Sequence, residues 1–276
     1  MTTTTGPVIP RSPLDRLRWA VADSWAVTLR DLTHWVHQPA TVVVGLLFPV
    51  LMVLMFGYLF GGAMSVPGGG DYREFLLPGL FALTMVFGIE ATIVAVTSDA
   101  AKGVTDRFRS MPMARSAVVV GRCTADLLNS MLGLAVLIAC GLVVGWQWRE
   151  GGGAALLAVG LLVLLRFALL WVGIYLGLLF KNPEAVVAVQ ILVWPLAFLS
   201  NAFVATATMP GWLGAAAEWN PLSATVAATR ELFGNPGWGG DSWMAQHAVM
   251  MAIVWPLLLF AVFFPLSVRR YQRLSR

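Results

Sequence analysis

The amino-acid sequence predicts an all-α polytopic membrane protein, and three observations support this fold class. The chain of 276 residues is 58% hydrophobic and only 12% charged, whereas a soluble chain of this length needs more charge to cover its surface. Six stretches are long and apolar enough to cross a bilayer. Almost every Lys and Arg lies outside these stretches.

The predicted spans follow from the length of each apolar stretch. The first has no charged residue in 20 positions, which is roughly 30 Å of helix at ~1.5 Å per residue. The six predicted transmembrane helices are residues 41–60, 75–96, 117–144, 154–180, 185–204 and 244–268. They form a transmembrane domain at 41–268, between an N-terminal region at 1–40 and a basic tail at 269–276.

The distribution of positive charge predicts the orientation. Cytoplasmic loops of membrane proteins collect Lys and Arg. With the N-terminus inside, 14 of the 18 Lys and Arg residues fall on the cytoplasmic side, three fall outside (Arg73, Arg149 and Arg230), and Arg166 lies within a span. We therefore expect both termini in the cytoplasm and the chain in the plasma (inner) membrane. This asymmetry also explains the net charge of +4 without a nucleic-acid partner.

Residues 13–36 have the pattern of an amphipathic helix. Apolar residues recur at steps of three and four and form one stripe. Three tryptophans of this segment suit the headgroup region of a bilayer. The sequence predicts a helix lying along the inner leaflet in contact with lipid, either as a simple anchor or with a further role.

The second predicted cytoplasmic loop, residues 98–116, contains a second amphipathic helix. Val104, Phe108 and Met111 stand at positions i, i+4 and i+7 among charged residues, and Pro112 ends the helix. Such a helix either lies on the lipid surface or inserts its apolar edge into a groove on a cytosolic partner.

The order of motifs in this loop resembles the loop between spans two and three of type-2 ABC exporter permeases, nearest to the daunorubicin-resistance permeases. The residues that carry the resemblance are Lys102-Gly103, Arg107-Phe108, Met111-Pro112, Arg115 and Gly121-Arg122. The stretch Asn220-Pro221-Leu222-Ser223, followed by Arg230-Glu231-Leu232-Phe233-Gly234, resembles a second family signature. The chain departs from the family at Ala101, where members often carry an acidic residue.

The resemblance implies a transport subunit that relies on partners. The loop would form a coupling helix that docks on a nucleotide-binding ATPase subunit, present in two copies. A second permease subunit, identical or paralogous, would complete the transporter. This chain has no P-loop motif, so it is not itself a P-loop ATPase. We expect no cofactor bound by this chain, and ATP and Mg would be used by the ATPase subunit. The substrate would be a hydrophobic or amphipathic compound, such as a drug, antibiotic or lipid, moved outward.

Between the last two spans, residues 205–241 are too polar to cross the membrane. Asn220 followed by Pro221 predicts a helix start, and Gly234 with Pro236 predicts its end. We expect one or two short re-entrant helices in the outer leaflet. Asn220, Pro221, Arg230 and Phe233 would belong to an external gate or, alternatively, to a passive lid.

Charged residues within the spans are a further candidate site. Glu90 and Arg166 lie inside predicted spans, and Arg122 lies near the inner end of the third. Such residues usually face a protein interior or water. We expect Glu90 to connect span two to a neighbour, with Arg122 or the N-terminal helix as candidate partners. The depths of Glu90 and Arg166 differ by roughly 10 Å at ~1.5 Å per residue, which disfavours a direct pair.

The predicted substrate pathway is lined by adaptable apolar side chains and one amide: Met52, Phe56, Met85, Trp194, Phe198 and Asn201. Two other classes of function remain at this stage. A proton-coupled secondary transporter would use Glu90 and Arg166 as an ion relay. An intramembrane enzyme would need a nucleophile with a base, or a metal set, and the sequence shows neither.

Overall fold

The structure is a computed structural model that describes residues 13–37, 39–60, 69–101, 117–180, 184–237 and 242–274. In these ranges the regular elements are all helical, without a strand. In chain order they are α1 (Pro13–His37), α2 (Pro39–Met55), the π-helix η1 (Phe56–Phe60), α3 (Tyr72–Ala101), α5 (Ala117–Val144), α6 (Gly152–Leu179), α7 (Glu184–Phe198), the 3-10 helix η2 (Thr206–Thr208), α8 (Gly211–Glu218), α9 (Pro221–Phe233), α10 (Trp243–Gln246) and α11 (Ala248–Leu274).

Four helices of the described chain are long and apolar enough to cross a membrane: Tyr72–Asp99, Val120–Val144, Gly152–Leu179 and Ala248–Tyr271. The chain is therefore a polytopic membrane protein, and its regular elements are helical throughout the described ranges. Two further apolar helices are shorter, Val43–Leu59 and Val186–Phe198. The predicted fifth span reached residue 204, but α7 ends at Phe198 because the chain bends there.

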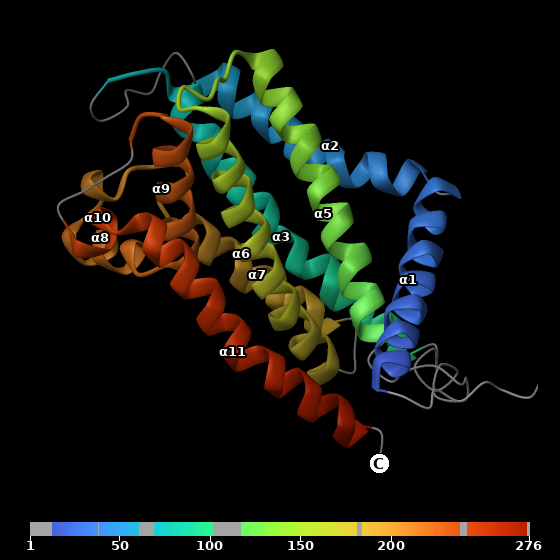
Figure 1. Cartoon of the computed structure of the whole chain (residues 1–276). Coiled ribbons are helices and arrows are strands. Elements are labelled where there is room, and N and C mark those ends of the chain that lie inside the picture. Colours follow the sequence, from blue (N-terminus) through green and yellow to red (C-terminus); the bar gives the residue numbers. More distant parts are fainter. Residues whose placement is uncertain are drawn as a thin grey trace, which may run out of the picture.

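The axes of α3, α5, α6 and α11 are roughly parallel, and α8, α9 and α10 gather at one end of the bundle (Figure 1). We call this the α9 end and call the opposite end, where α11 finishes, the α11 end. α3 packs on α6, and α6 packs on α11. α9 contacts α3, α6 and α11, so this short helix closes the bundle at the α9 end.

Small residues allow α3 and α6 to approach closely, as is common between membrane helices. A Cβ at Gly173 would lie 3.0 Å from Cβ of Thr92, and a Cβ at Gly177 would lie 2.8 Å from Cβ of Val96. Between α6 and α11 the contact is aromatic instead: Trp171 meets Phe264 edge to face, with ring centroids 4.7 Å apart.

The N-terminal helix α1 lies beside α5 near the α11 end (Figure 1). The hydroxyl of Thr28 donates to the carbonyl of Gly121 at 2.9 Å, and Val27 is buried in this contact. The apolar stripe predicted from the sequence points away from α5: Val21 is 63% exposed and Trp25 is 52% exposed. This face is therefore available to lipid.

Replacing Gly121 with Leu is expected to destabilise the protein by about 1–3 kcal/mol, because the larger side chain overpacks the contact between α1 and α5. A Cβ at Gly121 would collide with the carbonyl oxygen of Ser24 and lie 2.8 Å from Cβ of Val27. The free energy of unfolding of purified Gly121→Leu measures the effect. Gly160→Ala is the control, since a Cβ there meets nothing within 4 Å. Equal stability of both variants and the wild type would contradict the packing described.

Candidate functional site

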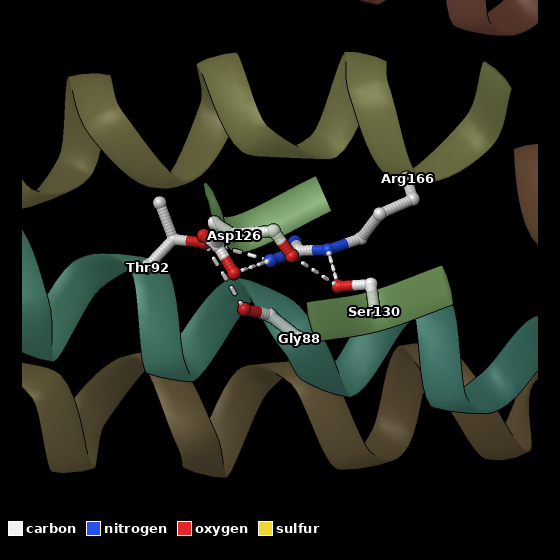
Figure 2. A network of polar contacts seen from close by, with 5 residues as sticks. All are labelled: Gly88, Thr92, Asp126, Ser130 and Arg166. Carbon is white, nitrogen blue, oxygen red and sulfur yellow. Dashed lines mark hydrogen bonds and ion pairs between the residues drawn. The ribbon is translucent and has the colours of Figure 1, made fainter. Parts of the chain in front are cut away.

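Arg166 is the centre of a polar network between α3, α5 and α6 (Figure 2). Its side chain is fully buried, and its Nη2 donates to Oδ1 of Asp126 at 2.8 Å and to the hydroxyl of Thr92 at 2.9 Å. Its Nε donates to Ser130 at 2.7 Å. One guanidinium therefore joins three membrane helices through a buried ion pair and two hydroxyls.

Local spacing on α3 and α5 creates this arrangement. Asp126 and Ser130 are one turn apart on α5, and Ser130 also donates to the backbone carbonyl of Asp126 at 3.0 Å. On α3, Gly88 leaves room for the guanidinium: a Cβ there would lie 2.7 Å from Cζ of Arg166. The network thus depends on a glycine, an acid and two hydroxyls in register on neighbouring helices.

Asp126 is a partner that the sequence interpretation missed. From the sequence, the difference in depth between Glu90 and Arg166 argues against a direct pair. The structure gives them separate partners, because Glu90 accepts from Nε2 of Gln190 on α7 at 2.8 Å. A signal was present in the sequence: Asp126 is the one acidic residue between positions 117 and 144.

The expectation that Glu90 connects its helix to a neighbour is met by Gln190, which was not among the partners considered. Arg122, one of those candidates, forms an ion pair with Asp99 near the α11 end of α3. Oε1 of Glu90 is buried and has no hydrogen-bond partner in the described part of the chain. Glu90 therefore has one satisfied oxygen and one unsatisfied oxygen.

A large cavity opens beside Glu90, between α1, α3, α5 and α7. Its volume is about 1080 Å³. Polar and charged side chains from all four helices line it, including Arg30, Glu90, Asp99, Arg122, Asp126 and Gln190. We call it the polar cavity. It lies in the half of the bundle toward the α11 end and is large enough for a drug-sized molecule.

Aromatic side chains continue from Glu90 toward the α9 end. Phe87 on α3 packs on Trp194 of α7 with ring centroids 4.7 Å apart, and Phe48 of α2 meets Trp194 edge to face at 5.9 Å. From Trp194 the contacts pass to Phe198 at 5.8 Å, and from there to Phe203 at 5.1 Å. We call Phe48, Phe87, Trp194, Phe198 and Phe203 the aromatic row.

The structure places the predicted pathway residues in different surroundings. Trp194 and Phe198 belong to the aromatic row, and Phe56 on η1 packs on Phe203 at 5.1 Å. Met52 is partly buried against the core. Met85 is only 1% exposed and packs inside the core, so the prediction that it lines a pathway is wrong for this conformation.

At the α9 end, the structure confirms the predicted boundaries of the short helix. Asn220 is the N-cap of α9, and its side chain accepts from the backbone N–H of Leu222 at 2.9 Å. Its amide group donates to the carbonyls of Leu196 and Leu199 at 2.7 Å and 2.6 Å, so it also caps the end of α7. Pro221 is the first helical residue, and Gly234 ends α9 in the left-handed conformation, with φ of 68°.

Arg230 of α9 is fully buried and acts as a backbone clamp. Each of its three guanidinium nitrogens donates to a backbone carbonyl: Nε to Phe75 at 2.7 Å, Nη1 to Asn201 at 2.8 Å and Nη2 to Ala202 at 3.0 Å. The guanidinium also stacks 3.6 Å from the ring centroid of Phe75. Burial lowers the pKa of Arg230 to about 9, which leaves it protonated at neutral pH. Asn201, a predicted pathway residue, thus has its backbone carbonyl held by Arg230.

Phe233 completes this structure from the last turn of α9. Its ring meets Trp146 edge to face, with centroids 5.0 Å apart, and its carbonyl accepts from the backbone N–H of Arg149 at 2.7 Å. Trp146 donates in turn to Asn235 at 2.8 Å. The residues predicted as an external gate therefore hold α9 against α3, α7 and the connection between α5 and α6.

The predicted coupling residues lie outside the described residues. They are Lys102, Gly103, Val104, Arg107, Phe108, Met111, Pro112 and Arg115. In the described ranges, no group of three or more His, Cys, Asp or Glu residues is arranged to hold a metal ion.

Comparison with known proteins gives a consistent result. The sequence profile of the ABC-2 type transporter family matches residues 23–233. The daunorubicin resistance ABC transporter permease protein DrrB1 of Streptomyces coeruleorubidus is 33% identical over 244 residues, covering 88% of this chain and 83% of that protein. The probable doxorubicin resistance ABC transporter permease protein DrrC of Mycobacterium tuberculosis is 22% identical over 236 residues, covering 83% and 86%.

A second protein of Mycobacterium tuberculosis, the doxorubicin resistance ABC transporter permease protein DrrB, is 27% identical over 154 residues, covering 54% of this chain and 51% of that protein. The family match covers most of the chain. The chain belongs to the ABC-2 type transporter family, as a membrane permease subunit of an ABC transporter.

Proposed function

We propose that this permease is the membrane-spanning half of an ATP-driven exporter that moves a hydrophobic or amphipathic compound out of the cell. The observation that supports this most strongly is the family match over residues 23–233, together with relatives named for daunorubicin and doxorubicin resistance. The polar cavity and the aromatic row agree with such a substrate, since they offer polar and apolar surfaces side by side.

The proposed topology has six spans. The four long helices make four of these spans. The other two are α2 continued by η1, and α7, which are apolar but shorter. A helix shorter than the hydrocarbon thickness is accommodated by local thinning of the bilayer or by association with a neighbour. The excess of Lys and Arg in the segments predicted to be cytoplasmic supports an orientation in the plasma membrane with the α11 end and both termini on the cytoplasmic side. The exposed stripe of α1 then contacts lipid of the inner leaflet.

The proposed partners are two copies of an ATPase subunit and a second permease, either the same chain or a paralogue. ATP and Mg belong to the ATPase. The loop at 102–116 docks on it, with the apolar edge of Val104, Phe108 and Met111 in a groove and the basic side chains around it. At the outer face, α9 serves as an external gate that moves together with α3 and α7, because Arg230 bonds to α3 and Asn220 bonds to α7.

A cross-linking experiment tests this coupling. Cysteine is placed at Phe108 or Met111 after replacement of Cys123 and Cys140, and the permease is purified with its ATPase. Both cysteines are expected to cross-link to the ATPase, and the yield is expected to change when ATP is added. Cysteine at Trp212, 76% exposed on α8 at the α9 end, is the control and is expected to give no cross-link. An active complex in which neither loop position reaches the ATPase would refute the docking.

Transport in sealed vesicles tests the energy source. Export is expected with ATP when the ATPase is present, and it is expected to be lost with the permease alone. Transport driven by a proton gradient without the ATPase would instead support a proton-coupled secondary transporter. The separate partners of Glu90 and Arg166 offer no direct relay between these two residues in the structure.

A further inference from the structure

Arg73, at the start of α3, joins the ends of two other helices. Its Nε donates to the carbonyl of Gly57 on η1 at 3.0 Å, and its Nη1 donates to the carbonyl of Val144, the last residue of α5, at 3.2 Å. Both residues belong to the last turn of their helices, where carbonyls lack a donor within the helix. A guanidinium suits this position, because the carboxyl end of a helix attracts positive charge. We call Arg73, Gly57 and Val144 the Arg73 clasp.

The Arg73 clasp holds the second half of the helix formed by α2 and η1. Gly57 is buried, and a Cβ there would lie 3.4 Å from Cγ1 of Val144, so η1 and the end of α5 are in van der Waals contact. One turn earlier, Val53 is only 1% exposed and belongs to the core. Residues 49–60 are therefore anchored by packing and by hydrogen bonds.

The first half of α2 is buried much less. Burial is described for residues 40 and 43–48, and all of these are exposed except Leu46, which is half-buried. Pro49 lies at the boundary between the two halves and removes one backbone hydrogen bond of the helix. Proline is among the common positions of a helix kink. Pro49 therefore divides α2 into an anchored half and a less buried half.

We propose that Arg73 is a positioning residue for transport: it fixes residues 49–60, while the first half of α2 swings about Pro49 during the transport cycle. The swing opens the contact between Phe48 and Trp194 in the aromatic row, whose ring centroids are 5.9 Å apart. Ring contacts constrain direction less than charge-assisted hydrogen bonds do, so the ring contact separates while the Arg73 clasp stays closed. This inference rests on the proposed export function and assigns the fixed and the moving part of α2.

Cross-linking in the purified full-length permease, without ATP, tests the Arg73 clasp. Cys123 and Cys140 are replaced first, and cysteines at positions 57 and 144 are joined by a short bifunctional thiol reagent. Replacing Arg73 with Met is expected to lower the yield severalfold, because η1 is no longer held on α5.

Two further variants make this test specific. Arg149→Met is the matched control, since Arg149 also bonds to the start of α3, at Glu74, and it is expected to keep the wild-type yield. Arg73→Gln retains an amide donor without the charge, so its yield is expected to lie between those of Arg73→Met and the wild type. A wild-type yield in either Arg73 variant that elutes as a folded protein overturns the proposal.

Two cross-links in the complete complex with the ATPase separate the moving half from the fixed half. Joining cysteines at Phe48 and Trp194 is expected to abolish ATP-driven transport relative to the same variant before cross-linking, and reduction is expected to restore it. Joining cysteines at Gly57 and Val144 is expected to leave transport unchanged. Transport that is blocked by the second cross-link, or that continues with the first, overturns the proposal.

Failure of the export function has a different outcome. If the variants show no ATP-driven transport before cross-linking, the exporter is removed, and the cross-linking yields still test the inference. With the ATPase present, ATP is expected to change the yield between positions 48 and 194 and to leave the yield between positions 57 and 144 unchanged. ATP-driven export with no ATP-dependent change between positions 48 and 194 keeps the exporter and removes the swing.

Discussion

Replacing Asp126 with Leu is expected to destabilise the folded permease by about 3–5 kcal/mol, the range for breaking a buried ion pair. The substitution leaves the guanidinium of Arg166 fully buried with Thr92 and Ser130 as its remaining partners in the network. Neither hydroxyl carries a negative charge. The free energy of unfolding in detergent measures the effect, and transport should fall with the fraction of folded protein.

Two controls make this prediction specific. The double variant Asp126→Leu with Arg166→Met is expected to recover most of the stability, because it removes both charges and replaces them with apolar volume. Arg149→Met breaks the ion pair between Arg149, whose side chain is 64% exposed, and Glu74, whose side chain is 10% exposed. It is expected to destabilise the protein less than Asp126→Leu, because the arginine of this pair lies in water. If the double variant is no more stable than Asp126→Leu alone, the loss comes from packing and the ion-pair explanation is wrong.

Local chemistry explains what could be predicted from the sequence. The Asn220-Pro221 start and the Gly234 end of α9 follow from capping rules that involve neighbouring residues, and the structure reproduces both positions. The long apolar helices follow from composition in the same way. The α1 stripe was also visible as a periodicity, and its exposure in the structure agrees with a lipid-facing role.

Contacts between distant helices explain what could not be predicted. The partner of Arg166 depends on the rotation and depth of α5, and the spacing of Asp126 and Ser130 does not determine either. Gln190 was hidden for the same reason, since its contact with Glu90 depends on where α7 crosses α3. The early end of α7 depends on the bend at residues 199–204, which Asn220 and Arg230 hold from elsewhere in the chain.

Arg166 and Arg230 are both fully buried, and they hold the protein in different ways. Arg166 meets a carboxylate and two hydroxyls, so its network contains side chains that a change in helix rotation could exchange. Arg230 bonds to the backbone carbonyls of Phe75, Asn201 and Ala202, and these carbonyls move only when the backbone that carries them moves. The position of α9 is therefore tied directly to the start of α3 and to the bend after α7.

Replacing Arg230 with Met is consequently expected to release α9 from the bundle and to destabilise the protein by several kcal/mol, since an unsatisfied buried acceptor costs about 1–3 kcal/mol. Asn201 and Ala202 lie outside the helices, so their carbonyls lose a donor that helical hydrogen bonding does not replace. Arg230→Lys is expected to recover only part of this loss, because one ammonium is a compact charge that does not reproduce the planar fork of a guanidinium.

Hydrogen exchange of residues 199–233, followed by mass spectrometry, distinguishes a local release of α9 from global unfolding. In Arg230→Met, exchange is expected to rise in α9 and in the bend at 199–204 before it rises in α6. Arg273→Met, an exposed position near the end of α11, is the matched control and is expected to leave exchange unchanged. Wild-type protection of α9 in Arg230→Met would mean that Asn220, Phe233 and the apolar face of α9 hold the helix without the arginine.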